Sequence, residues 1–196
     1  ETVSRKADKF LKDLGVEIHL NTMVKAYDGK TVTTNKEGLS FDTSTFIWAA
    51  GVSGAPIEGL NASALVEKPM RYDVNVFNQV RGYENIFAIG DIALMRTEKY
   101  PQGHPMVAQP AIQQGRLLAK NLVRIQKKEK MEPFSYRDKG TMATIGRNRA
   151  VVDMGKMKFG GFFAWFIWMF IHLYFLVGFR NRLITFFNWV YNYINF

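Results

Sequence analysis

An uncharged run near the C-terminus places the strongest constraint on how this chain can fold. It covers residues 159–179, 21 residues without a formal charge. A helix of that length measures about 30 Å, enough to cross a bilayer. Basic pairs flank both ends, Lys156 and Lys158 before the run and Arg180 and Arg182 after it. Because the flanks are balanced, they encode no preferred orientation across a membrane.

The residues after this run predict an amphipathic helix. Polar side chains recur at alternating intervals of four and three residues, at Asn181, Thr185, Asn188, Asn192 and Asn195. A single polar stripe favours a helix that lies in a membrane interface over one that crosses it. The expected membrane contacts are aromatic and basic residues of this tail: Trp165, Trp168, Arg180, Arg182, Phe186 and Trp189. A spanning helix and a soluble dimer interface remain as alternatives.

The net charge of +9 comes entirely from the C-terminal part of the chain. Residues 1–115 hold 12 basic and 13 acidic side chains, whereas residues 116–196 hold 14 and 4. Aromatic residues gather there too, with 16 of 28 in the last 38 residues. Basic charge beside apolar, aromatic helix is typical of a membrane-surface element. We expect no nucleic-acid partner, because these aromatics alternate with aliphatic residues and not with Lys or Arg.

Cysteine is absent from the sequence. This excludes disulfides, thiolate zinc sites, Cys-ligated iron–sulfur clusters and a redox or nucleophilic cysteine in this chain. The three histidines, His19, His104 and His172, lie far apart and show no metal-ligand spacing. We therefore expect no metal site.

The first 54 residues read as the second half of a nucleotide-binding α/β unit. Helical spacing over residues 3–14 ends at Gly15, and the glycine turn 51–54 follows the last apolar run. Four strands are predicted between them, at residues 16–20, 23–27, 31–34 and 45–50. The phosphate-binding pattern G-x-G-x-x-G that opens such a unit is missing. We therefore expect the chain to be the C-terminal piece of a longer dinucleotide-binding protein.

A second strand signal ends in a glycine and a carboxylate. The apolar run 86–89 predicts a buried strand, and Gly90-Asp91 follows it. Glycine lets a ligand approach the backbone closely, and a carboxylate accepts hydrogen bonds from sugar-type hydroxyls. A helix-capping role for Asp91 is the alternative.

The helix predicted at residues 106–127 begins with small and amide side chains. Gln109, Pro110 and Gln113 lie in its first turns, and proline fits an early helical position. The free N–H groups and positive dipole at such an end can stabilise negative charge on a heterocycle.

Five segments together resemble type II NADH:quinone oxidoreductases, over essentially the whole chain. They share the order that is typical of that family: residues 47–52 (IWAAGV), 85–91 (NIFAIGD), 108–115 (AQPAIQQG), 139–147 (KGTMATIGR) and the aromatic tail 161–182. Gly90-Asp91 alone marks only the wider group of flavoproteins with two dinucleotide domains. The double-glutamine helix, the Lys139 segment and the tail are more specific.

The resemblance implies cofactor and substrate residues at the matching positions. The FAD contacts implied are Gly90, Asp91, Ala108, Gln109, Pro110, Ala50 and Gly51. The quinone contacts implied are Gln109, Ile112, Gln113, Lys139 and Met142. Of these, Gln109, Gln113 and Lys139 are the candidate catalytic residues, and NADH is the implied donor. Some members of the family carry a polar residue at the position that matches Ile112. Because isoleucine has no polar group, we expect Ile112 to have no role in proton delivery.

The expected fold class is α/β, the C-terminal portion of a Rossmann-like flavoprotein with two dinucleotide-binding domains, followed by a helical membrane anchor. Residues 1–57 would complete an NADH-binding domain, 58–135 an FAD-binding domain, and 136–196 the quinone-site and anchor region. The implied activity is electron transfer from NADH through FAD to a membrane quinone without proton pumping. The implied location is peripheral and monotopic, on the cytoplasmic face of a bacterial inner membrane, with a homodimer possible.

Two alternatives stay open. The first is a related quinone-reducing flavoprotein with another donor, such as sulfide:quinone oxidoreductase, which needs redox cysteines that this chain lacks. The second is a non-catalytic membrane-binding fragment, because both phosphate-binding fingerprints are missing. For the same reason we expect the chain alone to be inactive.

Overall fold

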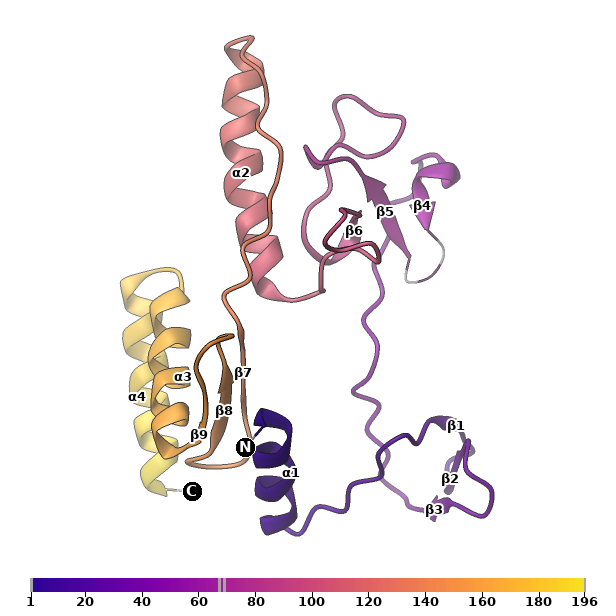
Figure 1. Cartoon of the computed structure of the whole chain (residues 1–196), viewed down its shortest axis with the longest axis vertical. Helices are drawn as coiled ribbons and strands as arrows, with labels where there is room; N and C mark the ends of the chain where they lie inside the picture. The colour runs from indigo at the N-terminus through magenta and orange to yellow at the C-terminus, as the bar shows by residue number, and fades with distance from the viewer. Residues whose placement is uncertain (1, 67, 69, 196) are drawn as a thin grey trace. The chain divides into compact units, whose positions relative to one another are not determined.

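The computed structural model describes residues 2–66, 68 and 70–195 and divides into two compact units. One unit combines residues 1–46 with 139–196, and the other consists of residues 47–138. Figure 1 shows the elements of both units along the chain. Each unit is described by itself.

The first unit contains two antiparallel three-stranded sheets and three helices. The meander β1-β2-β3 pairs Val32 with Phe41 and Tyr27 with Val32. The second sheet, β7-β8-β9, pairs Val152 with both Met142 and Phe159. The elements are α1 (Val3–Asp13), β1 (Val24–Tyr27), β2 (Thr31–Thr34), β3 (Ser40–Asp42), β7 (Thr141–Thr144), β8 (Ala150–Asp153), β9 (Lys158–Gly161), α3 (Phe162–Phe175) and α4 (Phe179–Asn195).

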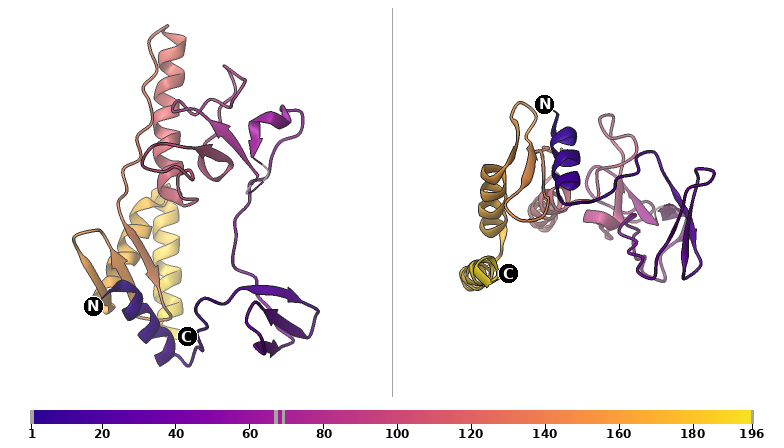
Figure 2. Two further views of the ribbon diagram at one scale, coloured as in Figure 1. Left: turned by 45° about the vertical axis from the view of Figure 1, so that its right-hand side comes forward. Right: turned by 90° about the horizontal axis from the view of Figure 1, so that it is seen from below.

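Helices cover both faces of the β7-β8-β9 sheet. Successive strand residues point to opposite faces, and Ala150 and Val152 pack with Ala164 of α3. The other face carries Gly160, where an added Cβ would lie 3.2 Å from the side chain of Lys6 on α1. Figures 1 and 2 show α1 and α3 on either side of this sheet, with α4 beside α3.

The second unit is built around a small mixed sheet in the order β4-β5-β6. Strands β5 and β6 run parallel, with Tyr72 opposite Ala93. Their buried side chains form a core with Val80 and Phe134. The elements are the 3-10 turn η1 (Ala62–Ala64), β4 (Leu65–Val66), β5 (Arg71–Val74), the 3-10 turn η2 (Gly90–Ile92), β6 (Ala93–Met95) and α2 (Ala108–Gln126).

Two side-chain amides of α2 hold the segment that returns after this helix. Asn121 donates from Nδ2 to the Glu132 carbonyl at 2.9 Å and accepts from the Glu132 N–H at 2.9 Å. Gln113 makes the same pair of bonds with Arg137, at 2.9 and 3.1 Å. Since an amide side chain offers both a donor and an acceptor, each residue satisfies a backbone that joins no strand. The segment also places Phe134 in the core.

Three of the predicted strands do not form. Residues 16–20 and 45–50 are irregular, and residues 86–89 contribute only an isolated bridge between Phe87 and Gln79. An apolar run becomes a strand only where another extended segment pairs with it through backbone hydrogen bonds. In the part of the chain that the structure describes, residues 45–50 enter no ladder, and Ile47 remains 81% exposed.

The predicted N-terminal helix, the helix at residues 106–127 and the C-terminal amphipathic helix are confirmed, with ends displaced by one or two residues. The N-terminal helix ends at Asp13, just before the predicted Gly15 stop, and α2 begins at Ala108. The uncharged run 159–179 is not one continuous helix: residues 159–161 belong to β9, Phe162–Phe175 form α3, and residues 176–178 form a turn in which the Leu176 N–H donates to the Leu173 carbonyl. The predicted amphipathic helix is α4. Among the residues described, no helix combines the length and the apolar character needed to cross a membrane.

The Asn121 clamp predicts a stability effect. We expect Asn121→Ala to lower the free energy of unfolding by about 1–3 kcal/mol, because it removes two partly buried hydrogen bonds to the Glu132 backbone, each contributing about 0.5–1.5 kcal/mol. Urea unfolding followed by circular dichroism measures the change. Gln126→Ala, at an exposed position of the same helix, is the control and should stay within about 0.5 kcal/mol of the parent chain. Equal effects of the two substitutions would contradict the clamp.

Candidate functional site

The Gly90-Asp91 turn is fixed against α2 by a buried amide. The Gly90 N–H donates to Oε1 of Gln114 at 2.7 Å, and the Gln114 side chain is almost fully buried. Gly90 has a φ of +71°, and an added Cβ would lie 3.2 Å from Cβ of Ala111. Both the backbone conformation and the close helix therefore require glycine here.

The adjacent carboxylate is exposed and available. Asp91 follows Gly90 in η2, and no Lys, Arg or His nitrogen lies within 4 Å of its carboxylate among the described residues. An unpaired, accessible carboxylate beside a glycine backbone can accept hydrogen bonds from ligand hydroxyls. Asp91 lies before strand β6 and does not cap an α-helix, which removes the capping alternative.

The N-terminus of α2 carries no side-chain cap. Val107 occupies the N-cap position, and its apolar side chain has no atom that could accept a hydrogen bond from a first-turn N–H. Ala108 is exposed, Gln109 is half-buried and Pro110 is buried. The free N–H groups and the helix dipole give this end a partial positive charge. Because η2 packs on the same helix, one element supports both the carboxylate turn and this positive end.

The buried side chain of Arg71 hydrogen-bonds two backbone segments that follow the Gly90-Asp91 turn. Arg71 on β5 donates through Nη2 to the carbonyls of Ala93 and His104, while its Nε has no partner among the residues described. Burial lowers the pKa of the Arg71 guanidinium, and attraction to Asp91 acts in the opposite direction. His104 packs in an aromatic cluster, and its burial lowers its pKa.

The predicted quinone residues of the second unit lie on one stretch of α2. Ile112 is 37% exposed, and Gln109 and Gln113 are half-buried. Gln113 already bonds the Arg137 backbone through both amide atoms. Its remaining N–H and its second oxygen lone pair are what it can offer to a ligand.

The predicted quinone residues of the first unit lie at β7. An added Cβ on Gly140 would come within 2.3 Å of the Asp153 carbonyl, so only glycine allows β7 to start this close to β8. The neighbouring Lys139 places its ammonium 5.8 Å from the centre of the Phe175 ring on α3. Met142 packs against the buried cluster of Ala150, Val152 and Ala164, the last of which lies on α3.

The remaining predicted residues occupy two different settings. Ala50 and Gly51 are exposed in an irregular segment. The tail tryptophans are partly buried between α3 and α4. The ring centres of Trp165 and Tyr193 are 5.7 Å apart, and those of Trp168 and Trp189 are 5.8 Å apart. Arg180 and Phe186 are exposed on α4. Arg182 donates from Nε to the Leu176 carbonyl at 2.8 Å, which satisfies the C-terminal end of α3.

Sequence reasoning missed four buried polar residues that hold this site: Arg71, His104, Gln114 and Asn121. It treated Gln114 as a member of a polar pair, although only one of the two glutamines is buried. A usable signal existed, because Gln114 and Asn121 are seven residues apart and therefore share one face of the helix.

Comparisons with known proteins place the chain in a family. Residues 1–115 match the family described as pyridine nucleotide-disulphide oxidoreductase. The chain belongs to this family. Residues 139–195 match the NDH2 C-terminal domain. These matches agree with the α/β fold class predicted from the sequence.

Relatives with a named function are 33–36% identical to the chain over the aligned residues. Type II NADH:quinone oxidoreductase NdhA of Mycobacterium tuberculosis is 36% identical over 94% of this chain and 40% of its own length. The predicted resemblance to type II NADH:quinone oxidoreductases is therefore confirmed. The chain spans about two-fifths of the length of that relative.

Solved structures show the same fold. NDH2 of Plasmodium falciparum, in complex with NADH, matches with a TM-score of 0.82 at 16% identity, over 96% of this chain and 54% of that one. The sulfide:quinone oxidoreductase of Aquifex aeolicus matches with a TM-score of 0.68 at 17% identity, over 91% and 45%. At these identities the likeness concerns the fold alone.

Buried His104 predicts a pH-dependent stability. Because its pKa is lowered in the folded chain, the unfolded chain binds a proton more readily, and folding stability falls as the pH drops below about 6.5. We expect His104→Phe to remove this contribution, up to about 1.4 kcal/mol per pH unit. Urea unfolding at pH 7.5, 6.5 and 5.5 measures it.

The matched control is His19→Gln, which changes a more exposed histidine. It should keep the pH dependence of the parent chain between those pH values. An unchanged pH dependence in His104→Phe would show that His104 does not carry the effect.

Proposed function

We propose that this chain forms part of a type II NADH:quinone oxidoreductase, in which NADH reduces FAD and the flavin reduces a membrane quinone without proton pumping. The observation that carries the proposal is the Gly90-Asp91 turn, braced by Gln114 against a helix whose N-terminus is uncapped. The relatives named for this activity support it. The fold shared with a sulfide:quinone oxidoreductase leaves another donor as the second candidate.

The residues of the turn and helix fit an FAD. Bound FAD would supply the chemistry, accepting a hydride from NADH and passing on two electrons. Asp91 accepts hydrogen bonds from ribityl hydroxyls, and Gly90 keeps the adjoining backbone free of a side chain. Ala108, Gln109 and Pro110 present the positive helix end to the electron-rich edge of the ring system, which favours the reduced, more negative form. Ala50 and Gly51 contribute a small-residue turn on the nicotinamide side.

The proposed quinone contacts combine amides, an amine and apolar groups. Gln109 and Gln113 donate hydrogen bonds to quinone carbonyls without adding charge to an apolar site. Lys139 stabilises negative charge that develops on the quinone during reduction. Ile112 and Met142 supply apolar contacts only.

The proposed partner surface is the lipid of a membrane. In the tail, Phe163, Phe170 and Val177 are 68%, 64% and 84% exposed, and Arg180 and Arg182 lie on the following helix. Such a pairing of exposed apolar and basic side chains suits a monotopic anchor that brings the flavin to a lipid-soluble substrate. Residues 154–196 contain no acidic side chain, so they offer no chain of intramembrane acids for a proton pump. The proposed location is the cytoplasmic face of a bacterial inner membrane, with a homodimer possible.

The test uses the complete gene product and the variant Asp91→Ala. We expect the parent protein to carry bound flavin and to oxidise NADH with a quinone analogue. We expect the variant to lose flavin affinity by about tenfold or more, because hydrogen bonds to a charged group contribute about 1.5–3 kcal/mol each. Flavin absorbance and steady-state turnover are the measurements.

The control is Glu98→Ala, which removes an exposed carboxylate from the same unit. It should retain both flavin and activity. A folded, colourless parent protein would overturn the flavoenzyme assignment. Flavin binding without NADH oxidation would favour the second candidate, an enzyme with another donor.

A further inference from the structure

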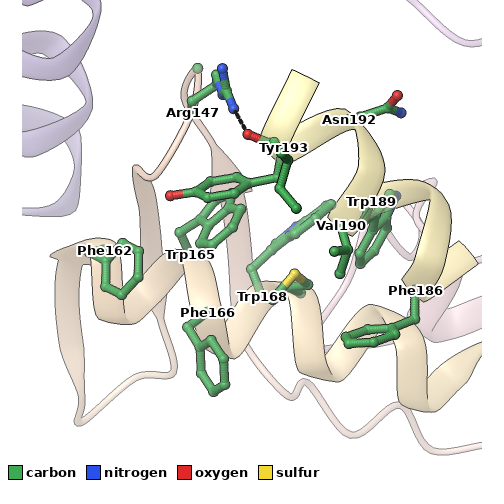
Figure 3. Close-up of a pocket in the computed structure, with 13 residues that line it drawn as sticks. Arg147, Phe162, Trp165, Phe166, Trp168, Phe186, Trp189, Val190, Asn192 and Tyr193 are labelled. Atoms are coloured by element: carbon green, nitrogen blue, oxygen red, sulfur yellow. Dashed lines mark hydrogen bonds between the residues drawn. The ribbon is translucent and has the colours of Figure 1, made fainter. Parts of the chain in front are cut away.

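A groove between α3 and α4 is large enough to hold a chain-like apolar ligand. Its volume is about 680 Å³, within the range of about 300–1,000 Å³ that is typical of small-molecule sites. The walls are mainly aromatic, and Trp165, Trp168 and Trp189 contribute to them. Figure 3 shows Arg147 and Tyr193 at one end of the groove, and Phe166 and Phe186 at the other.

Of the described residues that line this groove, Arg147 alone carries a charge. It lies in the turn between β7 and β8, where its guanidinium donates to the Tyr193 carbonyl and lies 5.1 Å from the centre of the Tyr193 ring. Within the described residues, no carboxylate approaches Arg147 to within 4 Å. The side chain is exposed. The groove therefore combines an apolar interior with an unpaired, pre-positioned cation at one end.

The surrounding sequence strengthens this charge pattern. Residues 139–196 carry seven basic side chains and a single acidic one, Asp153. That carboxylate is bound to Lys158 at 3.0 Å, and this pairing lowers its pKa. No acidic side chain of this segment is left to neutralise Arg147, so the complementary ligand is an anion with an apolar chain.

The geometry points to a binding site for one acidic phospholipid, with an acyl chain in the α3–α4 groove and the phosphate on Arg147. A guanidinium binds phosphate through two parallel N–H···O bonds, which suits a fixed position at the mouth of a groove. This inference rests on the proposed association with a membrane. It goes beyond general attraction to lipid because it predicts a preference for one lipid class at one side chain. A neutral isoprenoid chain would fill the groove without using Arg147.

The test measures quenching of tryptophan fluorescence by brominated lipids in the full chain. Vesicles contain phosphatidylcholine with a minor fraction of phosphatidylglycerol, and the same amount of brominated acyl chain is carried on one lipid or on the other. Three of the four tryptophans line the groove. We expect stronger quenching when the bromines are on phosphatidylglycerol.

Two variants separate the charge from the cavity. Arg147→Gln should weaken the preference for phosphatidylglycerol by about fivefold, the effect of one basic residue near an anionic surface. Val190→Phe places a larger side chain in the groove and should reduce quenching by both brominated lipids. Val190 is 39% exposed, so the larger ring fits without unfolding, and circular dichroism checks this.

Matched controls lie away from the groove. Arg5→Gln removes a basic side chain from α1, on the opposite face of the β7-β8-β9 sheet, and should keep the parent preference. Val123→Phe makes the same apolar change at an exposed site of α2 and should leave quenching unchanged.

The outcomes distinguish this site from the membrane proposal. Vesicle flotation with equal quenching by the two brominated lipids would overturn the lipid site and leave membrane association standing. Displacement of brominated phosphatidylglycerol by an isoprenoid quinone, with no effect of Arg147→Gln, would assign the groove to the quinone tail and also overturn it. Failure of the chain to float with either vesicle would overturn both proposals. Preference for phosphatidylglycerol that Arg147→Gln removes and Arg5→Gln retains supports the site.

Discussion

One hydrogen bond to a buried amide organises the candidate flavin site: the Gly90 N–H donates to the Gln114 side chain. Gly90 lies in a left-handed turn that no strand ladder stabilises, because the preceding residues 86–89 form only an isolated bridge. An unpaired N–H in this position would carry the full cost of desolvation. Gln114 removes that cost and at the same time fixes Asp91 relative to the helix. The positions proposed for flavin contact within this unit depend on that link.

Helix α2 supports two neighbouring segments through its buried amide side chains. Its buried polar residues are amides: Gln114 bonds the backbone of the turn η2, and Asn121 bonds the backbone of the irregular segment after α2. An amide can do this without a charge to desolvate. Gln113 makes a similar clamp from a less buried position. The same residue is therefore both structural and a proposed quinone contact, and these two roles compete for its hydrogen bonds.

The sequence predicted the N-terminal helix, α2, α4 and the glycine–aspartate turn, because these depend on local periodicity and on glycine. The strand predictions were wrong where pairing with a distant segment decides whether a strand forms. Residues 45–50 have the apolar character of a buried strand, yet their structure depends on neighbours that periodicity does not reveal. The bonding of Gln114 could not be predicted either, because its acceptor role depends on a backbone N–H 24 residues away. The unpaired Arg147 at the α3–α4 groove likewise emerges only when α3, α4 and the β7–β8 turn meet.

The most direct test of this account is the flavin affinity of Gln114→Leu in the complete gene product, measured by spectroscopic titration. The account predicts binding weaker by about tenfold, the equivalent of about 1.4 kcal/mol, because the Gly90 N–H loses its acceptor. Gln114→Glu retains an acceptor oxygen and should retain affinity closer to the parent, as should Gln126→Leu at the exposed end of α2. Parent-like flavin affinity in a folded Gln114→Leu protein would contradict the claim that this hydrogen bond positions the site.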